Sequence, residues 1–215
     1  MLIKLFYTVL LFSLSATAYA KGFVLCNGDL IFQESCVDSN MSKAIKDVTV
    51  GVEGYNFVHV GIVWIAPDDS IYVIEATQPK VCVTKLQDYL YPKAEKECLP
   101  KSVVGRLKSP YQPLIGKALV EAIKLIGKDY DDAFDLKNDK YYCSELIYDI
   151  FLKANNNNPV FDLNTMTFRS KATGKFSPDW IAHFQKLGIA IPEGELGTNP
   201  GTMSRSEVID ILHAF

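Results

Sequence analysis

The sequence predicts an α+β fold in which an antiparallel sheet packs on helices. Segments rich in β-branched and aromatic residues cluster in the first half of the chain, and amphipathic helical patterns follow in the second half. Of the 215 residues, 48% are hydrophobic and 22% are charged, which is ordinary composition for a globular protein. This length suits one domain with a full core, which we place at residues 21–215.

Residues 1–20 predict a signal peptide that precedes this domain. Lys4 gives a short positive start, residues 5–16 are almost wholly apolar, and Ala18-Tyr19-Ala20 has the small-x-small pattern of a signal-peptidase site. The alternative is an uncleaved membrane anchor, but the apolar run is shorter than the roughly 20 residues that span a bilayer. We therefore expect a mature chain that begins near Lys21 and lies in the periplasm or outside the cell.

The strands of the sheet are expected in the first half of the chain. Val, Ile and aromatic residues dominate these segments, and turn residues separate two of them at residues 66–70. The expected strands cover residues 28–33, 57–65, 71–76, 81–83 and 103–107.

The helices are expected mainly in the second half. Apolar residues recur at helical spacing from Leu114 to Ile126, with Gly127 as a C-terminal cap, and again from Cys143 to Phe151. Ser177-Pro178 is typical of a helix start, and Gly188 of its end. A shorter helix is expected at residues 39–46, and the Gly- and Pro-rich tail from residue 189 is expected on the surface.

Export changes how the five cysteines are interpreted, because oxidising compartments favour disulfides. An odd count leaves at least one thiol without a partner inside the chain. We expect Cys82 to pair with Cys98, and Cys26 with Cys36. This hypothesis leaves Cys143 as the free thiol.

Cys143 lies at the start of a predicted helix, with Asn138 or Asp139 upstream as a possible cap. Unpaired backbone N–H groups and the helix dipole favour an anion there, so a thiol ionises more easily. A thiolate is the form that attacks carbonyl carbons. The alternative is a buried structural cysteine, which is a frequent role for free cysteines.

His59 lies inside an otherwise apolar predicted strand, where a polar ring requires a structural or catalytic partner. If the following turn is centred near Pro67, His59 and Glu75 are cross-strand neighbours. A carboxylate beside an imidazole orients the ring and stabilises its protonated form. Cys143, His59 and Glu75 then form a nucleophile, base and orienting group, although the last two also suit a structural hydrogen-bonded pair.

Other chemistries have no motif in the sequence. We find no HExxH, CxxC or Asp-rich calcium loop, and therefore predict no metal site and no cofactor. Phosphate-binding loops and GxSxG elbows are also absent. The formal net charge of −3, with no basic stripe, gives no indication of a nucleic-acid partner.

Four segments together resemble the YiiX/YaeF family of permuted papain-like amidases, which is related to NlpC-type cell-wall peptidases and to lecithin retinol acyltransferase. The segments are Gly-Asp-Leu-Ile-Phe-Gln at residues 28–33, His-Val-Gly-Ile-Val at 59–63, Ile-Glu-Ala at 74–76 and Tyr-Cys-Ser-Glu-Leu-Ile-Tyr at 142–148. The resemblance covers roughly residues 28–151. Each motif alone is weak, but the four in this order are fairly specific.

The resemblance implies a circularly permuted papain-like (NlpC-type) fold, with a sheet or barrel packed on helices, in which the histidine precedes the cysteine. It places the family's catalytic residues at His59, Cys143 and Glu75, and it implies a position near the site for Gln33, which equally suits the role of a polar strand-end residue. Tyr130 and Tyr142 are candidate substrate-binding residues, although aromatic residues near a helix start more often serve packing.

The predicted activity is amide hydrolysis through a thioester acyl-enzyme, on murein peptides, N-acyl amides or other small-molecule, peptide or lipid amides. Two alternatives remain: an acyltransferase or lipid esterase on the same fold, and a non-catalytic binding module that keeps the papain-like groove.

Overall fold

A computed structural model describes residues 22–36, 39–92 and 101–215. Its centre is a six-stranded sheet with strand order β4-β3-β2-β1-β5-β8. Every neighbouring pair in this sheet is antiparallel. The strands are β1 (Leu30–Glu34), β2 (His59–Ile65), β3 (Ile71–Thr77), β4 (Lys80–Lys85), β5 (Lys101–Leu107) and β8 (Ile209–Ala214). The described strands thus form an open sheet with edges at β4 and β8, and the closed barrel that we allowed for is not formed by them.

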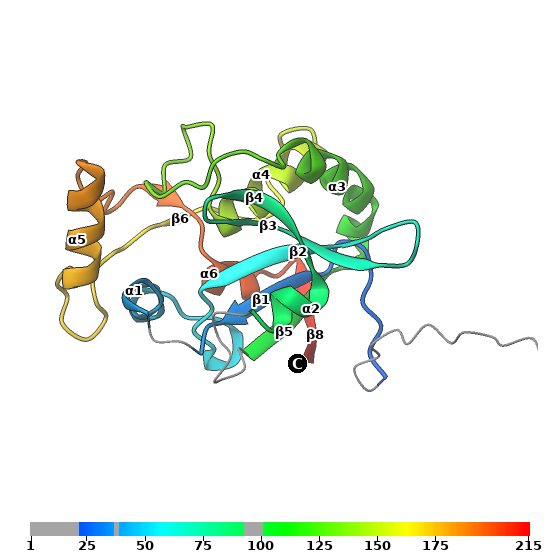
Figure 1. The fold of residues 1–215 in the computed structure, drawn as a ribbon, viewed down its shortest axis with the longest axis horizontal. Helices are drawn as coiled ribbons and strands as arrows, with labels where there is room; N and C mark the ends of the chain where they lie inside the picture. Colours follow the sequence, from blue (N-terminus) through cyan, green and yellow to red (C-terminus); the bar gives the residue numbers. More distant parts are fainter. Residues whose placement is uncertain (1–21, 37–38, 93–100) are drawn as a thin grey trace, which may run out of the picture.

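Two helices cover one face of the sheet (Figure 1). They are α3 (Ile115–Lys124) and α4 (Cys143–Ala154), which contact each other, and α4 also contacts β2 and β3. The apolar stripe of α4 is buried there because Leu146, Ile147 and Ile150 pack with Val60 and Ile62 of β2 in the main core. The opposite face carries the alternate residues of the same strands, which pack with the short helix α2 (Leu86–Leu90).

A second packing unit lies at one end of the molecule, where α5 (Pro178–Leu187) stands beside α1 (Asn40–Val48) (Figure 1). Ser177 accepts a hydrogen bond from Trp180 N–H, and Gly188 closes α5 in the left-handed conformation, as the sequence predicts. The indole of Trp180 donates a hydrogen bond to the carbonyl of Ala44 at 3.2 Å, which joins α5 to α1. Phe168 and Phe184 pack around it.

The expected surface tail from residue 189 is wrong in its second half. β8 is the edge strand beside β5, and α6 (Pro200–Ser204) buries Met203 in the main core. Helix α2 is a second addition, in a stretch for which the sequence predicted no helix or strand. The remaining short elements of the described residues are two 3-10 helices at Val52–Gly54 and Ser109–Leu114 and the two-stranded pair β6 (Asn164–Thr165) and β7 (Leu196–Gly197).

Both expected disulfide pairings are wrong. Cys26 and Cys82 are free thiols, as is Cys143. The pairing with Cys98 fails at Cys82, whereas Cys98 itself lies outside the described residues. The predicted signal peptide, residues 1–20, also lies outside the described residues, which begin at Gly22 in the predicted domain. Within the part of the chain that the structure describes, no helix has the length and apolar character needed to cross a membrane.

Candidate active site

The starts of β2 and α4 meet at one end of the sheet, and this meeting point defines the candidate site. Cys143 is the first residue of α4, and His59 is the first residue of β2. The Cys143 thiol lies 4.0 Å from the carbonyl oxygen of Val58, the residue before His59, and the Cys143 side chain raises the pKa of His59. A cysteine and a histidine that are 84 positions apart in the printed sequence are therefore direct neighbours.

Helix α4 begins where the chain leaves an extended conformation at Tyr142, which is the N-cap residue. The Glu145 carboxylate accepts a hydrogen bond from the backbone N–H of Tyr142 at 3.1 Å. The expected caps are wrong, because Asn138 accepts from the N–H of Lys140 and Asp139 pairs with Lys128. Tyr142, a bulky residue, therefore holds the position before Cys143.

Glu145 places a carboxyl group in the same first helical turn as Cys143. Burial raises the pKa of Glu145 to about 9, against the lowering effect of the Tyr142 hydrogen bond, and the charges of Asp131 and Asp149 raise it further. Glu145 is therefore protonated at neutral pH. It caps the helix without adding a negative charge beside the thiol.

The Glu75 carboxylate reaches His59 from the neighbouring strand. Oε2 of Glu75 lies 2.5 Å from Nε2 of His59. The register differs from the expected one by two positions, because Ile62 pairs with Ile74 and Val63 with Val73. A shift of two residues keeps every side chain on its face of the sheet, so Glu75 becomes a diagonal neighbour of His59 and remains within reach.

Gly61 gives this diagonal contact its space. In the observed register Gly61 lies opposite Glu75, and a Cβ atom at Gly61 would approach the Cβ of Glu75 to 3.3 Å and a methyl group of Val73 to 2.4 Å. The absence of a side chain at this position lets β3 and the stem of Glu75 lie close to β2.

Thr84 on β4 holds the other oxygen of Glu75. Its hydroxyl donates a hydrogen bond to Oε1 of Glu75 at 2.5 Å. The two carboxylate oxygens therefore have separate partners, Thr84 and His59, which fixes the orientation of the group. The sequence prediction missed Thr84 because its strand was drawn only to residue 83. The alternation of β4 was the available signal, since Cys82 lies opposite Glu75 and Thr84 is two residues further along.

The charges around His59 favour its protonated form. Burial alone would lower the pKa of His59, but hydrogen bonds with Cys143 and Glu75, together with their negative charges, raise it from 6.5 to about 10. Burial raises the pKa of Glu75, whereas the hydrogen bond and positive charge of His59 and the hydrogen bond of Thr84 lower it overall. At neutral pH the pair is thus an imidazolium and a carboxylate.

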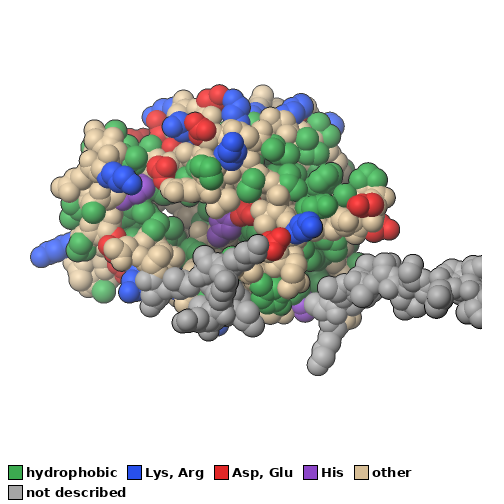
Figure 2. Space-filling model, viewed as in Figure 1, with side chains coloured by type: hydrophobic (Ala, Val, Ile, Leu, Met, Phe, Trp, Pro, Cys, Tyr) green, Lys and Arg blue, Asp and Glu red, His purple; other side chains and the backbone are tan. Residues whose placement is uncertain are grey.

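Two cavities meet at this point, separated by Val58 and Ile45, which line both. The first, of about 360 Å³, contains Cys143 in its wall and lies between α4 and the α1–α5 unit. The second, of about 350 Å³, contains His59 and Glu75 and lies on the α2 side. We call the first the cysteine cavity and the second the histidine cavity. Figure 2 shows a hollow between the part of the molecule that holds α5 and the part that holds the sheet.

The predicted binding residues divide between these cavities. Tyr130 and Tyr142 line the cysteine cavity beside Cys143. Gln33 lines the histidine cavity and lies opposite His59 in the β1–β2 register. Its amide nitrogen donates to the carbonyl of Tyr89 at 2.9 Å and to the hydroxyl of Ser102 at 3.2 Å. Gln33 therefore ties three elements together behind His59.

Most of the cysteine-cavity wall was missed by the sequence prediction. Phe134, Met166, Phe168 and Trp180 give it an apolar surface, and Arg205 adds a single cation. These residues come from segments far apart in the chain, and only packing in three dimensions brings them together. The described residues contain no group of three or more His, Cys, Asp and Glu side chains arranged to hold a metal ion, so we assign no metal ligands.

A cysteine at the start of a helix and a histidine on a strand that comes earlier in the chain agree with a family of known proteins. A family model described as "Permuted papain-like amidase enzyme, YaeF/YiiX, C92 family" matches residues 24–213. The chain belongs to this family. Its helices and antiparallel sheet therefore form a permuted papain-like fold, and its family is one of amidases.

Two relatives agree with this assignment. YiiX of Escherichia coli (strain K12), which is described as uncharacterized, is 30% identical over 146 residues, or 68% of this chain and 67% of that protein. A crystal structure of YiiX from Escherichia coli O157:H7, described as a metalloprotein, has a TM-score of 0.68 at 24% identity. The alignment covers 87% of this chain and 96% of that one. At this identity the similarity shows the fold alone.

Proposed function

We propose that the protein is a cysteine amidase in which Cys143 is the nucleophile, His59 the general base and acid, and Glu75 the group that orients His59. One observation carries the proposal: His59 interacts with both partners, because its Nε2 lies 2.5 Å from Oε2 of Glu75 and the Cys143 side chain raises its pKa. A single proton can then pass between the sulfur and the ring while Glu75 holds the ring in place.

The reaction proceeds in two halves. The Cys143 sulfur attacks the amide carbonyl carbon, a C–S bond forms, and His59 gives the thiol-derived proton to the leaving nitrogen as the C–N bond breaks. The product of this half is a thioester and a free amine. A water molecule then gives a proton to His59 and attacks the thioester carbon, and the C–S bond breaks to return the thiol and a carboxylic acid.

The start of α4 supplies donors for the charge that develops on the carbonyl oxygen. The first backbone N–H groups of a helix have no partner within the helix, and those of Cys143 and Ser144 belong to this turn. We assign the oxyanion to the N–H of Cys143 with one further donor.

The two cavities suit the two halves of an amide. The acyl group stays bonded to sulfur, so it belongs in the cysteine cavity, which is lined by Cys143 and not by His59. The amine receives its proton from His59, so it leaves through the histidine cavity. The apolar wall of the cysteine cavity suits murein peptides with apolar side chains, or N-acyl amides with an apolar stretch next to the scissile bond.

Substitutions and labelling together test the catalytic roles. Cys143→Ala and His59→Ala should each reduce hydrolysis of an acyl para-nitroanilide at least about a thousandfold, and Glu75→Gln should cost less because it retains a hydrogen bond. Cys26→Ala, at an exposed free thiol, is the matched control and should keep wild-type turnover. Iodoacetamide at pH 6 should alkylate Cys143 faster than Cys26. Wild-type turnover by Cys143→Ala would refute the cysteine mechanism.

The same thioester can serve an acyltransferase or a lipid esterase, and analysis of the products with water and amine acceptors separates hydrolysis from transfer. A binding module without catalysis predicts ligand binding with no turnover in any of these variants.

We also propose that residues 1–20 export the chain. N-terminal sequencing of the native protein should find a start at or near Lys21, outside the cytoplasm. An intact Met1 in a membrane fraction would indicate an anchor instead.

A further inference from the structure

The cysteine cavity has an uneven distribution of charge. Its lining combines apolar and aromatic side chains with neutral polar ones, and its single charged member is Arg205, next to the end of α6. No Asp or Glu is among the described residues that line it. A cavity with one cation and no carboxylate attracts a negatively charged group.

Arg205 differs from the other two arginines of the chain. Arg106 makes two hydrogen bonds to the buried carboxylate of Asp29, at 2.7 and 2.8 Å. Arg169 pairs with Glu193 at 3.2 Å and lies over the ring of Phe176. Arg205 forms no ion pair with any carboxylate in the described part of the chain. Its guanidinium therefore keeps its donors available for a ligand.

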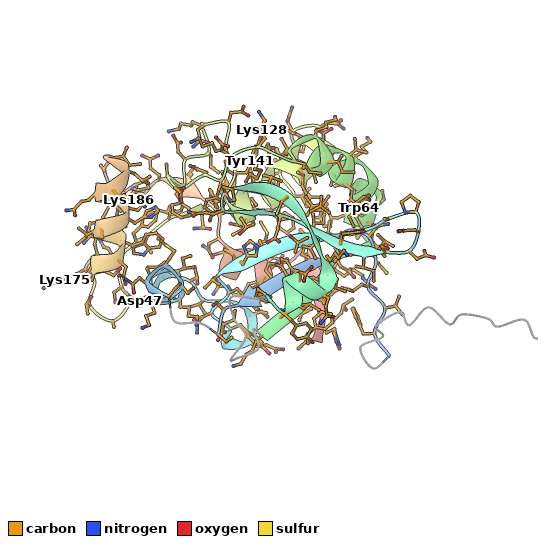
Figure 3. The ribbon with its side chains drawn as sticks, in the orientation of Figure 1. Asp47, Trp64, Lys128, Tyr141, Lys175 and Lys186 are labelled. Carbon is orange, nitrogen blue, oxygen red and sulfur yellow. The ribbon has the colours of Figure 1, made fainter. Side chains whose placement is uncertain are left out.

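The charged neighbour of Arg205 is another cation. Desolvation lowers the pKa of Lys171, the positive charge of Arg205 lowers it further, and Asp47 acts in the opposite direction. Asp47 lies on α1 on the side toward α5 (Figure 3), and its charge acts on Lys171. Neither Lys171 nor Asp47 is among the described residues that line the cavity, whereas Arg205 is.

We propose that Arg205 selects the acyl group: the preferred donor has an apolar part that fills the cysteine cavity and an anionic end that pairs with Arg205. This inference rests on the proposed function, because it identifies the cysteine cavity as the acyl side of the scissile bond. The ligand class is an amide of an amphipathic acid with a second acidic group, such as a terminal carboxylate. Arg205 is a specificity-determining residue that acts on the far end of the substrate.

The first test compares two substrates of equal chain length, the mono-para-nitroanilide of adipic acid and hexanoyl para-nitroanilide. The wild-type protein should prefer the adipoyl compound in kcat/KM by about fivefold, the scale of an exposed ion pair. Arg205→Gln should bring the ratio to about one, and Arg205→Lys should retain most of the preference. Lys171→Gln, at a cation that does not line the cavity, is the matched control and should change the ratio less.

The second test measures binding without turnover. Cys143→Ala and the double variant with Arg205→Gln are titrated with both compounds at low and high salt. The adipoyl compound should bind Cys143→Ala about fivefold more tightly than the hexanoyl compound, and salt should reduce this difference. Equal binding of the two compounds, or a preference that survives Arg205→Gln, would overturn the inference. Selective binding with no turnover in the wild-type protein would instead count against the amidase proposal alone.

Discussion

His59 and Cys143 set the chemistry of the site, and each depends on a neighbouring side chain: His59 on Glu75, and Cys143 on His59. The imidazole of His59 is held by Oε2 of Glu75, and the other oxygen of that carboxylate is held by Thr84. Because Thr84 binds Oε1 of Glu75, the other oxygen, Oε2, is left to contact His59. Thr84 therefore determines the orientation of the carboxylate. The sulfur of Cys143 then meets a ring that is both positively charged and fixed in orientation.

Replacement of Thr84 tests this positioning role. Thr84→Val removes the donor to Glu75 but keeps the shape of the side chain, so kcat/KM should fall about tenfold, on the scale of a hydrogen bond to a charged group. Thr84→Ser should restore most of the activity. The alkaline limb of the pH–rate profile should also shift in Thr84→Val, since a looser carboxylate stabilises the imidazolium less. An unchanged profile in Thr84→Val would show that Thr84 has only a structural role.

The same pair makes stability depend on pH. The pKa of His59 is raised from 6.5 to about 10, so its contribution is complete below pH 6.5 and is lost as the pH rises toward 10. The pKa of Glu75 is lowered from 4.5, so its contribution is present above pH 4.5 and is lost as the pH falls further. Denaturant unfolding should therefore show the largest difference between wild type and His59→Gln/Glu75→Gln at about pH 5 to 6. A difference that stays constant to pH 10 would contradict the raised pKa.

At the scale of elements, the spacing of β2 and β3 depends on a missing side chain. Gly61→Ala places a Cβ atom 2.4 Å from a methyl group of Val73, so the two strands must separate or shift. We expect a loss of about 1–3 kcal/mol of unfolding free energy, as for other overpacked cores, and a weaker contact between Glu75 and His59.

Gly116→Ala on α3 is the matched control for this prediction. A Cβ atom at Gly116 meets no heavy atom within 4 Å, so the change should stabilise the protein by up to about 1 kcal/mol. Thermal unfolding and turnover of the two variants give the comparison. A Gly61→Ala protein with unchanged stability and activity would mean that the strands adapt freely.

The elements that the sequence predicted well are those with strong local patterns. β2 and β3 consist mostly of Val, Ile and aromatic residues, and α5 carries both of its caps. Helix α2 has only five residues and β8 follows a Gly- and Pro-rich stretch, so neither has a pattern long enough to detect. The predicted contact between Glu75 and His59 is present although the predicted β2–β3 register was wrong by two positions. Side chains along a strand alternate with a period of two, so a shift of two keeps them on the same face.

At the scale of the whole molecule, the fold separates two tasks. The sheet and α4 hold the reacting side chains, whereas α1, α5, α6 and the segment that follows β6 supply much of the cavity wall beside them. Short sequence motifs indicated His59, Glu75 and Cys143, because these residues lie on the regular elements β2, β3 and α4. No comparable motif indicated Trp180 or Arg205, because their place beside Cys143 arises from packing between distant segments.

This separation predicts that α5 affects substrate binding more than chemistry. Trp180→Phe removes the hydrogen bond from the indole to the carbonyl of Ala44 and leaves space at the cavity wall. Stability should fall by about 2 kcal/mol, through an unpaired carbonyl and lost packing. KM for an acyl para-nitroanilide should rise severalfold with little change in kcat, and the rate of Cys143 alkylation by iodoacetamide should remain as in the wild type. Ile181→Ala, at a more exposed position on the same helix, should change none of these strongly. A large fall in the alkylation rate of Trp180→Phe would show instead that α5 helps to position the start of α4, and that binding and chemistry are not separate in this fold.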